Sequence, residues 1–231
     1  MLILAVDTSG KQGSIALVRV PDGANPAGAL RAGVETLEVV PLAGGTFSAQ
    51  LVPQISSLLT KHGLSKQEIG AFAVASGPGS FTGLRVGLSA VKALAEILGK
   101  PIATVSLLEA VARMGKAKGK VLGVLDAGRG EVYAGEYEVG KGARMLSERL
   151  LTRAEFVTEA RGSVVVTPDP GLSSLARSSG LEVVEIEQPR SDVIARLGWG
   201  KLQAGETISP EKLEANYIRR SDAEIFAKSS P

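Results

Sequence analysis

Cysteine is missing from this chain, and histidine occurs only once, at His62. Without thiols the chain can form no disulfide, use no cysteine nucleophile and hold no metal through thiolates. A single histidine also excludes zinc sites that need several imidazoles, and no Ser, His and Asp arrangement for peptide hydrolysis can be assigned around it. Because His62 directly precedes Gly63, we expect it to cap a helix C-terminus or to face solvent.

Charge of one sign and long apolar runs are missing as well. The 26 basic and 24 acidic side chains are interspersed and leave a net charge of +2. The composition therefore predicts no strong positive electrostatic field that would attract nucleic acid. The apolar opening of the chain ends at Asp7 and lacks the basic start of a signal peptide, and no run is long enough for a bilayer. We therefore expect a cytoplasmic protein with no membrane contact.

Glycine, in contrast, is abundant, and a glycine-rich run occupies residues 76–87. The pattern predicts a buried strand over residues 71–75 and a helix over residues 83–98, with the glycines at the turn between them. Free amides at a helix N-terminus attract negative charge, and glycine allows a ligand or another backbone segment to come close. The turn therefore fits an anion or nucleotide cradle, or else a purely structural tight turn. Its spacing matches neither the Walker loop nor the dinucleotide fingerprint.

The pattern that opens the chain recurs near its middle. The apolar strands predicted over residues 2–6 and 121–125 end in Asp7 and Asp126, and each is followed by a glycine-containing turn and a second strand. Two α/β halves that begin in this way are typical of the actin, sugar kinase and Hsp70 (ASKHA) superfamily, where such aspartates hold metal or water beside nucleotide phosphates. Aspartates that only shape turns would give the same pattern.

This internal repeat predicts the fold class and the domain division. We expect an α/β protein with a two-lobed ASKHA-like fold, in which each lobe is a duplicated unit that carries a β-hairpin. The N-terminal lobe, with the glycine-rich motif, is predicted over residues 1–105. The C-terminal lobe is predicted over residues 106–231 and includes a polar tail from residue 209.

Two predicted helices, over residues 48–61 and 83–98, carry much apolar surface. On the second, two apolar stripes leave only a narrow polar strip, so the helix is either buried in the subunit or placed at a shared interface. One stripe contains Leu84, Leu88, Val91, Ala95 and Leu98, and the other contains Val86, Ala90, Ala93 and Ile97.

Several segments resemble the TsaB (YeaZ) family, bacterial proteins that take part in making threonylcarbamoyladenosine on tRNA. They are residues 3–9, 77–87, 126–127 with 130–133, and 217–219. The most specific is the motif Gly77-Pro78-Gly79-Ser80-Phe81-Thr82-Gly83-Leu84-Arg85-Val86-Gly87. Two positions depart from the family, which usually has histidine where this chain has Phe47 and Ser48, and arginine where it has Gly128.

The resemblance implies a non-catalytic scaffold and activator rather than an enzyme. Such a subunit forms a homodimer or a heterodimer with TsaD, and the ATPase TsaE joins the assembly. TsaD then transfers threonylcarbamoyl to N6 of adenosine 37 in ANN-decoding tRNAs. No cofactor is expected in this chain, because ATP and metal belong to the partner subunits, and tRNA is reached through the complex.

The resemblance also implies two sets of site residues. Family members pair through the two apolar helices, so the expected partner interface consists of Leu51, Ile55, Leu84, Gly87, Leu88, Val91 and Ala95. A vestigial nucleotide or phosphate cleft is expected at Asp7, Thr8, Gly77, Gly79, Ser80 and Asp126. The alternative function is an autonomous ASKHA-type ATPase or phosphotransferase, whose cleft carboxylates would hold magnesium.

Overall fold

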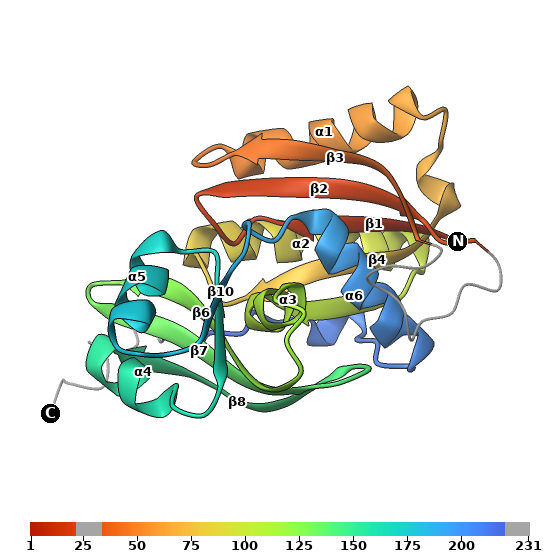
Figure 1. Ribbon diagram of the computed structural model, residues 1–231. Coiled ribbons are helices and arrows are strands. Elements are labelled where there is room, and N and C mark those ends of the chain that lie inside the picture. The colour runs from red at the N-terminus through yellow and green to blue at the C-terminus, as the bar shows by residue number, and fades with distance from the viewer. Residues whose placement is uncertain (22–33, 220–231) are drawn as a thin grey trace, which may run out of the picture. The chain divides into compact units, whose positions relative to one another are not determined.

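The computed structural model describes residues 1–21 and 34–219, and the chain divides into two compact units. Of the described residues, Met1–Ala110 and Gln188–Ala215 form the first unit, and Val111–Glu187 and 216–219 form the second. Figure 1 gives the order of the elements along the chain. None of the described helices is long and apolar enough to cross a membrane.

A five-stranded mixed sheet forms the centre of the first unit, in the order β3-β2-β1-β4-β5. Strands β1 (Leu2–Asp7), β2 (Gln12–Arg19) and β3 (Glu35–Ala43) form an antiparallel meander. Strand β4 (Ile69–Gly77) pairs in parallel with β1, and β5 (Ile102–Ser106) pairs in parallel with β4. The central strands are apolar without interruption because helices cover both faces of the sheet.

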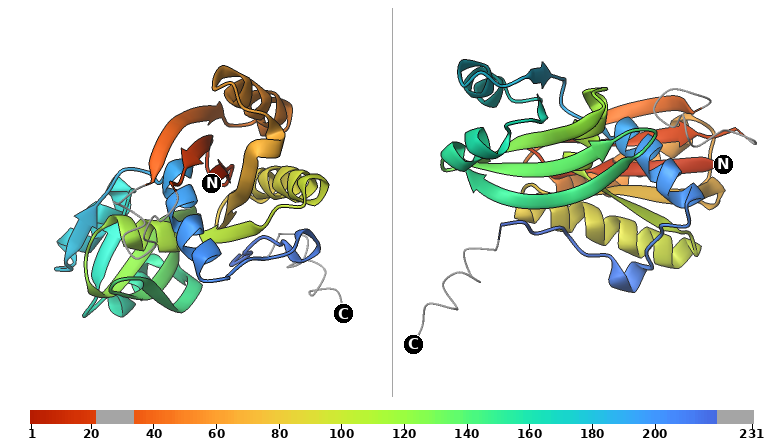
Figure 2. Two further views of the ribbon diagram at one scale, coloured as in Figure 1. Left: turned by 90° about the vertical axis from the view of Figure 1, so that its right-hand side faces the viewer. Right: turned by 60° about the horizontal axis from the view of Figure 1, so that its bottom comes forward.

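Helices α1 (Phe47–Lys61) and α2 (Phe81–Leu98) lie side by side on one face of this sheet. Helix α6 (Ser191–Gln203) packs on the opposite face (Figure 2). Its contact with β4 is close, because a Cβ on Gly198 would lie 2.6 Å from the Cβ of Ala73. Short 3-10 turns lie at Lys66–Glu68 (η2) and Pro210–Lys212 (η3).

The second unit repeats the strand order of the first, as β8-β7-β6-β9-β10. Strands β6 (Gly119–Gly128), β7 (Glu131–Val139) and β8 (Ala143–Thr152) form an antiparallel meander. Strands β9 (Val164–Thr167) and β10 (Val183–Glu185) extend the sheet in parallel from β6. When β6 is matched to β1, order and direction agree strand by strand, which confirms the predicted duplication and fold class.

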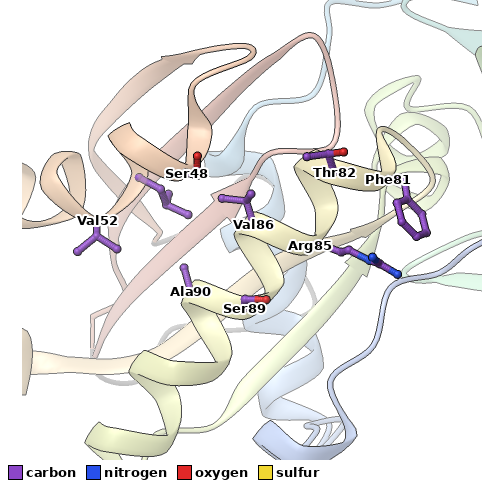
Figure 3. Close-up of a pocket in the computed structure, with 9 residues that line it drawn as sticks. Ser48, Val52, Phe81, Thr82, Arg85, Val86, Ser89 and Ala90 are labelled. Carbon is purple, nitrogen blue, oxygen red and sulfur yellow. The ribbon is translucent and has the colours of Figure 1, made fainter.

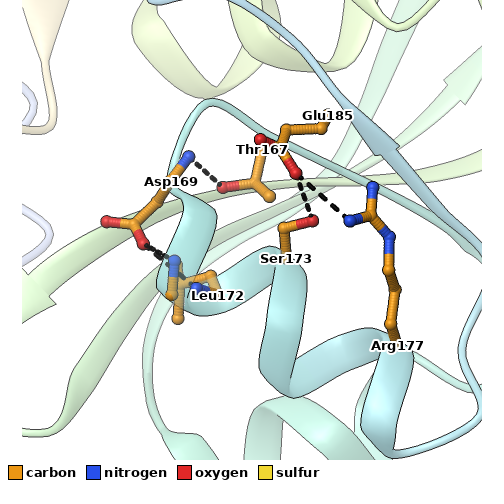
Figure 4. Close-up of polar contacts among 7 residues, drawn as sticks. Thr167, Asp169, Leu172, Ser173, Arg177 and Glu185 are labelled. Atoms are coloured by element: carbon orange, nitrogen blue, oxygen red, sulfur yellow. Dashed lines mark hydrogen bonds and ion pairs between the residues drawn. The ribbon is translucent and has the colours of Figure 1, made fainter.

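Three further helices complete the description: α3 (Leu107–Met114), which crosses the boundary between the units, α4 (Arg153–Glu159) and α5 (Pro170–Ser178). Helix α5 is fixed by the polar contacts in Figure 4. The Asp169 carboxylate caps its N-terminus by accepting the Gly171 and Leu172 amides at 2.8 and 3.0 Å. Glu185 of β10 accepts the Ser173 hydroxyl at 2.7 Å and pairs with Arg177 at 3.4 Å, so α5 is tied to the neighbouring strand.

The domain division differs from the sequence prediction in one respect. The chain passes into the second unit at Val111, close to the predicted boundary, but residues 188–215 return to the first unit. They return because the apolar face of α6 is buried against the first sheet, with Ile194 and Ala195 fully covered. Residues 220–231, the end of the predicted polar tail, lie outside the described residues.

Candidate functional site

Asp7 ends β1 and is almost fully buried, at 5% exposure. Its Oδ1 atom accepts hydrogen bonds from the Ser9 amide, at 2.9 Å, and from the Ser9 hydroxyl. Burial raises the pKa of the Asp7 carboxyl group above its ordinary value, and the two bonds from Ser9 oppose that rise without cancelling it. The Asp7 carboxylate is therefore fixed by hydrogen bonds from Ser9, two residues further along the chain.

The glycine-rich turn packs directly against the residues that follow Asp7. The Thr8 hydroxyl donates to the Gly83 carbonyl at 2.7 Å, and the Ser80 amide donates to the Ser9 carbonyl at 2.6 Å. A Cβ on Gly79 would lie 2.3 Å from the Ser9 carbonyl oxygen, and one on Gly83 would lie 2.0 Å from the Thr8 carbonyl oxygen. These glycines let two backbone segments touch, as a tight structural turn requires.

Ser80 accepts two of the backbone amides in the first turn of α2, and the Leu84 amide donates to its carbonyl at 2.8 Å. The Ser80 side chain accepts the Gly83 amide at 3.3 Å and so caps the helix. Gly77 has a φ of 117°, which only glycine adopts without strain. Packing thus accounts for the glycines of this motif, and a phosphate role for Asp7, Thr8, Gly77, Gly79 and Ser80 stays a prediction.

Asp126 has the matching position in the second unit, near the end of β6, but a different environment. Its side chain is exposed, whereas that of Asp7 is buried. The turn between β6 and β7 is instead held by Arg219, which donates to the Ala127 carbonyl at 2.9 Å and pairs with Glu131. The two units therefore share the sequence pattern, but the two aspartates differ in burial and in the contacts around them. Each aspartate lies in its own unit, and a shared cleft stays a prediction.

The structure places the predicted interface residues inside the first unit, and their part in partner binding stays a prediction. All seven are buried in the first unit, and six of them, all but Gly87, belong to its apolar core. Leu84, for example, is 1% exposed and Val91 is fully covered. The stripe chosen from the sequence faces the sheet because α2 packs on β4 and β1 through it. The seven residues are Leu51, Ile55, Leu84, Gly87, Leu88, Val91 and Ala95.

The other stripe of α2 is the one that meets solvent. It borders a groove of about 500 Å³ between α1 and α2, where Val52, Val86 and Ala90 face one another (Figure 3). Val52 of α1 is 56% exposed. Ile97, which follows Val86 and Ala90 on the same face of α2, is 75% exposed. The groove is lined by Ser48, Leu51, Val52, Phe81, Thr82, Arg85, Val86, Ser89 and Ala90.

At one end of the groove, the Arg85 side chain lies over the aromatic ring of Phe81. The Arg85 guanidinium lies 3.7 Å from the centre of the Phe81 ring, a distance at which cation and ring attract each other. Val52, Phe81 and Arg85 were missed as site residues, although Val86 and Ala90 were identified as a second stripe. Arg219 was also missed as a site residue, and its place in a segment that resembles the family was the available signal.

No group of three His, Asp or Glu side chains within residues 1–21 and 34–219 is arranged to hold a metal ion.

Comparison with known proteins gives the following similarities. Residues 39–163, more than half of the chain, match the family model described as TsaD: tRNA N6-adenosine threonylcarbamoyltransferase. The tRNA threonylcarbamoyladenosine biosynthesis protein TsaB of Bacillus subtilis is 36% identical over 143 residues, which are 62% of this chain and 57% of that protein. The protein of the same name from Escherichia coli is 29% identical over 236 residues, 96% of each chain. The structure of YeaZ from Pseudomonas aeruginosa has a TM-score of 0.71 at 24% identity, over 94% of this chain and 99% of that one, and bears on the fold alone.

Proposed function

Because the chain belongs to the TsaB (YeaZ) family, as the sequence predicted, and matches the TsaD family model over more than half its length, we propose that it is a non-catalytic scaffold and activator in threonylcarbamoyladenosine biosynthesis. Its full-length relative from Escherichia coli is named for that biosynthesis. In this proposal the chain pairs with TsaD, TsaE joins them, and TsaD transfers threonylcarbamoyl to N6 of adenosine 37 in ANN-decoding tRNAs.

The same proposal assigns the remaining roles. The chain holds no cofactor of its own, while ATP and metal belong to the partner subunits. It reaches tRNA as part of the complex and works in the cytoplasm. The buried state of Asp7 supports a non-catalytic role, because a carboxylate enclosed by Ser9 is poorly placed to hold magnesium.

The observation that carries the proposal is the apolar groove between α1 and α2. Val52 and Ile97 are large apolar side chains that protrude into solvent on these helices, and Val86 and Ala90 continue the surface between them. Apolar surface of this kind, bordered by polar residues such as Ser48 and Ser89, is typical of protein interfaces. We assign the partner surface to this outward face, for TsaD and for a second copy of the chain alike.

The pairing is tested by placing a charge in the groove. Val86→Glu should weaken binding to TsaD by about a hundredfold, because the carboxylate would have to be buried without a partner. Ser57→Glu adds the same charge to an exposed position of α1 that does not line the groove, and should bind like wild type. Binding is measured by titration with purified TsaD, and circular dichroism checks that both variants fold. Equal binding by both variants would place the interface elsewhere.

The function itself is tested by threonylcarbamoyladenosine formation on tRNA. Purified TsaD and TsaE receive threonylcarbamoyl-adenylate and ATP, with and without this chain. We expect formation to depend on the chain and to fall with Val86→Glu but not with Ser57→Glu. If the chain gives no stimulation but hydrolyses ATP alone, and Asp7→Ala abolishes that turnover, the autonomous ATPase would replace the proposed function.

A further inference from the structure

A cluster of basic side chains lies at one end of the second sheet, at the opposite end of β6 from the turn that Arg219 holds. Between Glu109 and Asp126 the sequence has four basic residues and no acidic one, and three of them, Lys116, Lys118 and Lys120, fall within five positions. They occupy the connection from α3 to β6 and the start of β6. All three are exposed.

The fold brings two further cations to the same place. The antiparallel register sets Lys120 of β6 opposite Glu138 of β7, and Glu138 opposite Arg144 of β8. Residues directly opposite each other share a face of the sheet, so these side chains form one row across three strands. Lys141 lies in the turn between β7 and β8, two strands that Figure 1 draws as a hairpin.

These five cations, Lys116, Lys118, Lys120, Lys141 and Arg144, are the basic patch. Lys120 lies 3.9 Å from Glu136, but across the described part of the chain the other four form no ion pair. The cations outnumber the nearby Glu136 and Glu138 by three, whereas the whole chain carries a net charge of only +2. The basic patch therefore has a local excess of positive charge over the acidic side chains in its row.

We propose that the basic patch binds the phosphate backbone of tRNA. Exposed lysines release counterions when they neutralise phosphates, and this release supplies most of the affinity of sequence-independent nucleic-acid binding. The identity of the polyanion rests on the proposed function. The patch would let this subunit hold tRNA directly, in addition to the contacts that tRNA makes elsewhere in the complex.

The test measures binding of the full chain to a fluorescently labelled, unmodified ANN-decoding tRNA transcript between 50 and 200 mM salt. The variant Lys116→Gln, Lys118→Gln, Lys120→Gln should bind about tenfold more weakly at 50 mM salt, and its salt slope should be smaller by about 2 to 3. The control variant Lys66→Gln, Lys100→Gln, Lys212→Gln removes the same charge from the first unit and should bind like wild type.

Equal weakening in both triple variants would overturn the proposal, because only the total charge would then matter. So would undiminished binding in the patch variant. Lys141→Gln with Arg144→Gln, on the neighbouring strand and turn, repeats the test without touching residues 116–120. Met145, which is 60% exposed beside Arg144, would also suit a lipid surface. Binding of the patch to phosphatidylserine vesicles but not to tRNA would therefore also overturn the proposal.

Failure of this inference and failure of the proposed function give different results. If the patch variant stimulates threonylcarbamoyladenosine formation with an unchanged KM for tRNA and binds tRNA like wild type, the function stands and the patch is not a tRNA site. If the wild-type chain gives no stimulation but binds tRNA through the patch, the binding site stands and the proposed function fails.

Discussion

Burial of the Asp7 carboxyl group makes the stability of the protein depend on pH in a predictable direction. Its pKa in the folded protein lies above 3.8, because burial disfavours the charged form. The folded state therefore binds the proton more tightly, so the free energy of unfolding falls as pH rises from 3.8 through the folded pKa, and this contribution is constant above it. Asp7→Asn, which keeps an oxygen for the Ser9 bonds, removes this dependence.

We expect Asp7→Asn to be more stable than wild type at pH 7, with the difference shrinking as the pH falls towards 3.8. Urea unfolding at several pH values measures it, with fluorescence from the single tryptophan, Trp199, as the signal. A difference that is constant with pH would contradict the prediction, because both proteins would then bind protons equally.

The close contact between Gly83 and the Thr8 carbonyl predicts a large effect for the smallest possible side chain. Gly83→Ala would put a methyl group 2.0 Å from that oxygen, so either α2 or the end of β1 must move. We expect a loss of about 3 kcal/mol in the free energy of unfolding. Gly200→Ala is the matched control within α6, because a Cβ added at Gly200 would have no neighbouring side chain within 4 Å. This substitution should be neutral or stabilising by up to about 1 kcal/mol. Equal stability of both variants in urea unfolding would contradict the packing role of the motif.

Helix α2 has two apolar faces, and the structure separates their roles. Leu88→Ala should cost about 2 to 4 kcal/mol of stability, because Leu88 is 6% exposed and packs in the core of the first unit. Ile97→Ala should change stability by less than about 0.5 kcal/mol, since its side chain is 75% exposed. Thermal unfolding of the two variants measures the difference. Similar losses in both would mean that the outer stripe is part of a folded-state contact.

The same helix shows what the sequence could and could not predict. Its position and its two stripes followed from apolar periodicity. Periodicity does not tell, however, which of the two stripes packs on β4 and β1. The choice depends on where Thr8 and β4 place the start of α2, which is a tertiary contact. For this reason the helix pair was predicted well, whereas the stripe chosen for the interface lies against the sheet.

Across the whole chain, the repeat of strand, aspartate and glycine turn predicted two similar halves, because each half depends on local pattern. The environments of Asp7 and Asp126 could not be predicted, since residues 70 or more positions away decide which aspartate is buried. The return of residues 188–215 to the first unit was missed for a similar reason. An amphipathic helix requires a surface to cover, but its sequence does not say which of two sheets provides it.

The two units have separate cores, so a change in one should be detectable without a change in the other. Arg219 holds the β6–β7 turn of the second unit through the Ala127 carbonyl and Glu131, and its guanidinium lies 5.8 Å from the centre of the Tyr133 ring. Arg219→Ala should cost the second unit about 1.5 to 3 kcal/mol, because Glu131 loses its half-buried partner.

The position of the only tryptophan makes that prediction testable. Trp199 lies on α6 and reports on the first unit, whereas far-ultraviolet circular dichroism reports on the strands of both. With Arg219→Ala we expect the circular dichroism transition in urea to begin earlier and the Trp199 fluorescence transition to stay in place. Hydrogen exchange in β6 and β7 should accelerate in parallel, and Arg177→Ala, which breaks only a surface pair in the same unit, should leave these strands protected. If both signals shift together by the same amount, the chain unfolds as one cooperative body and the contact of Arg219 stabilises all of it.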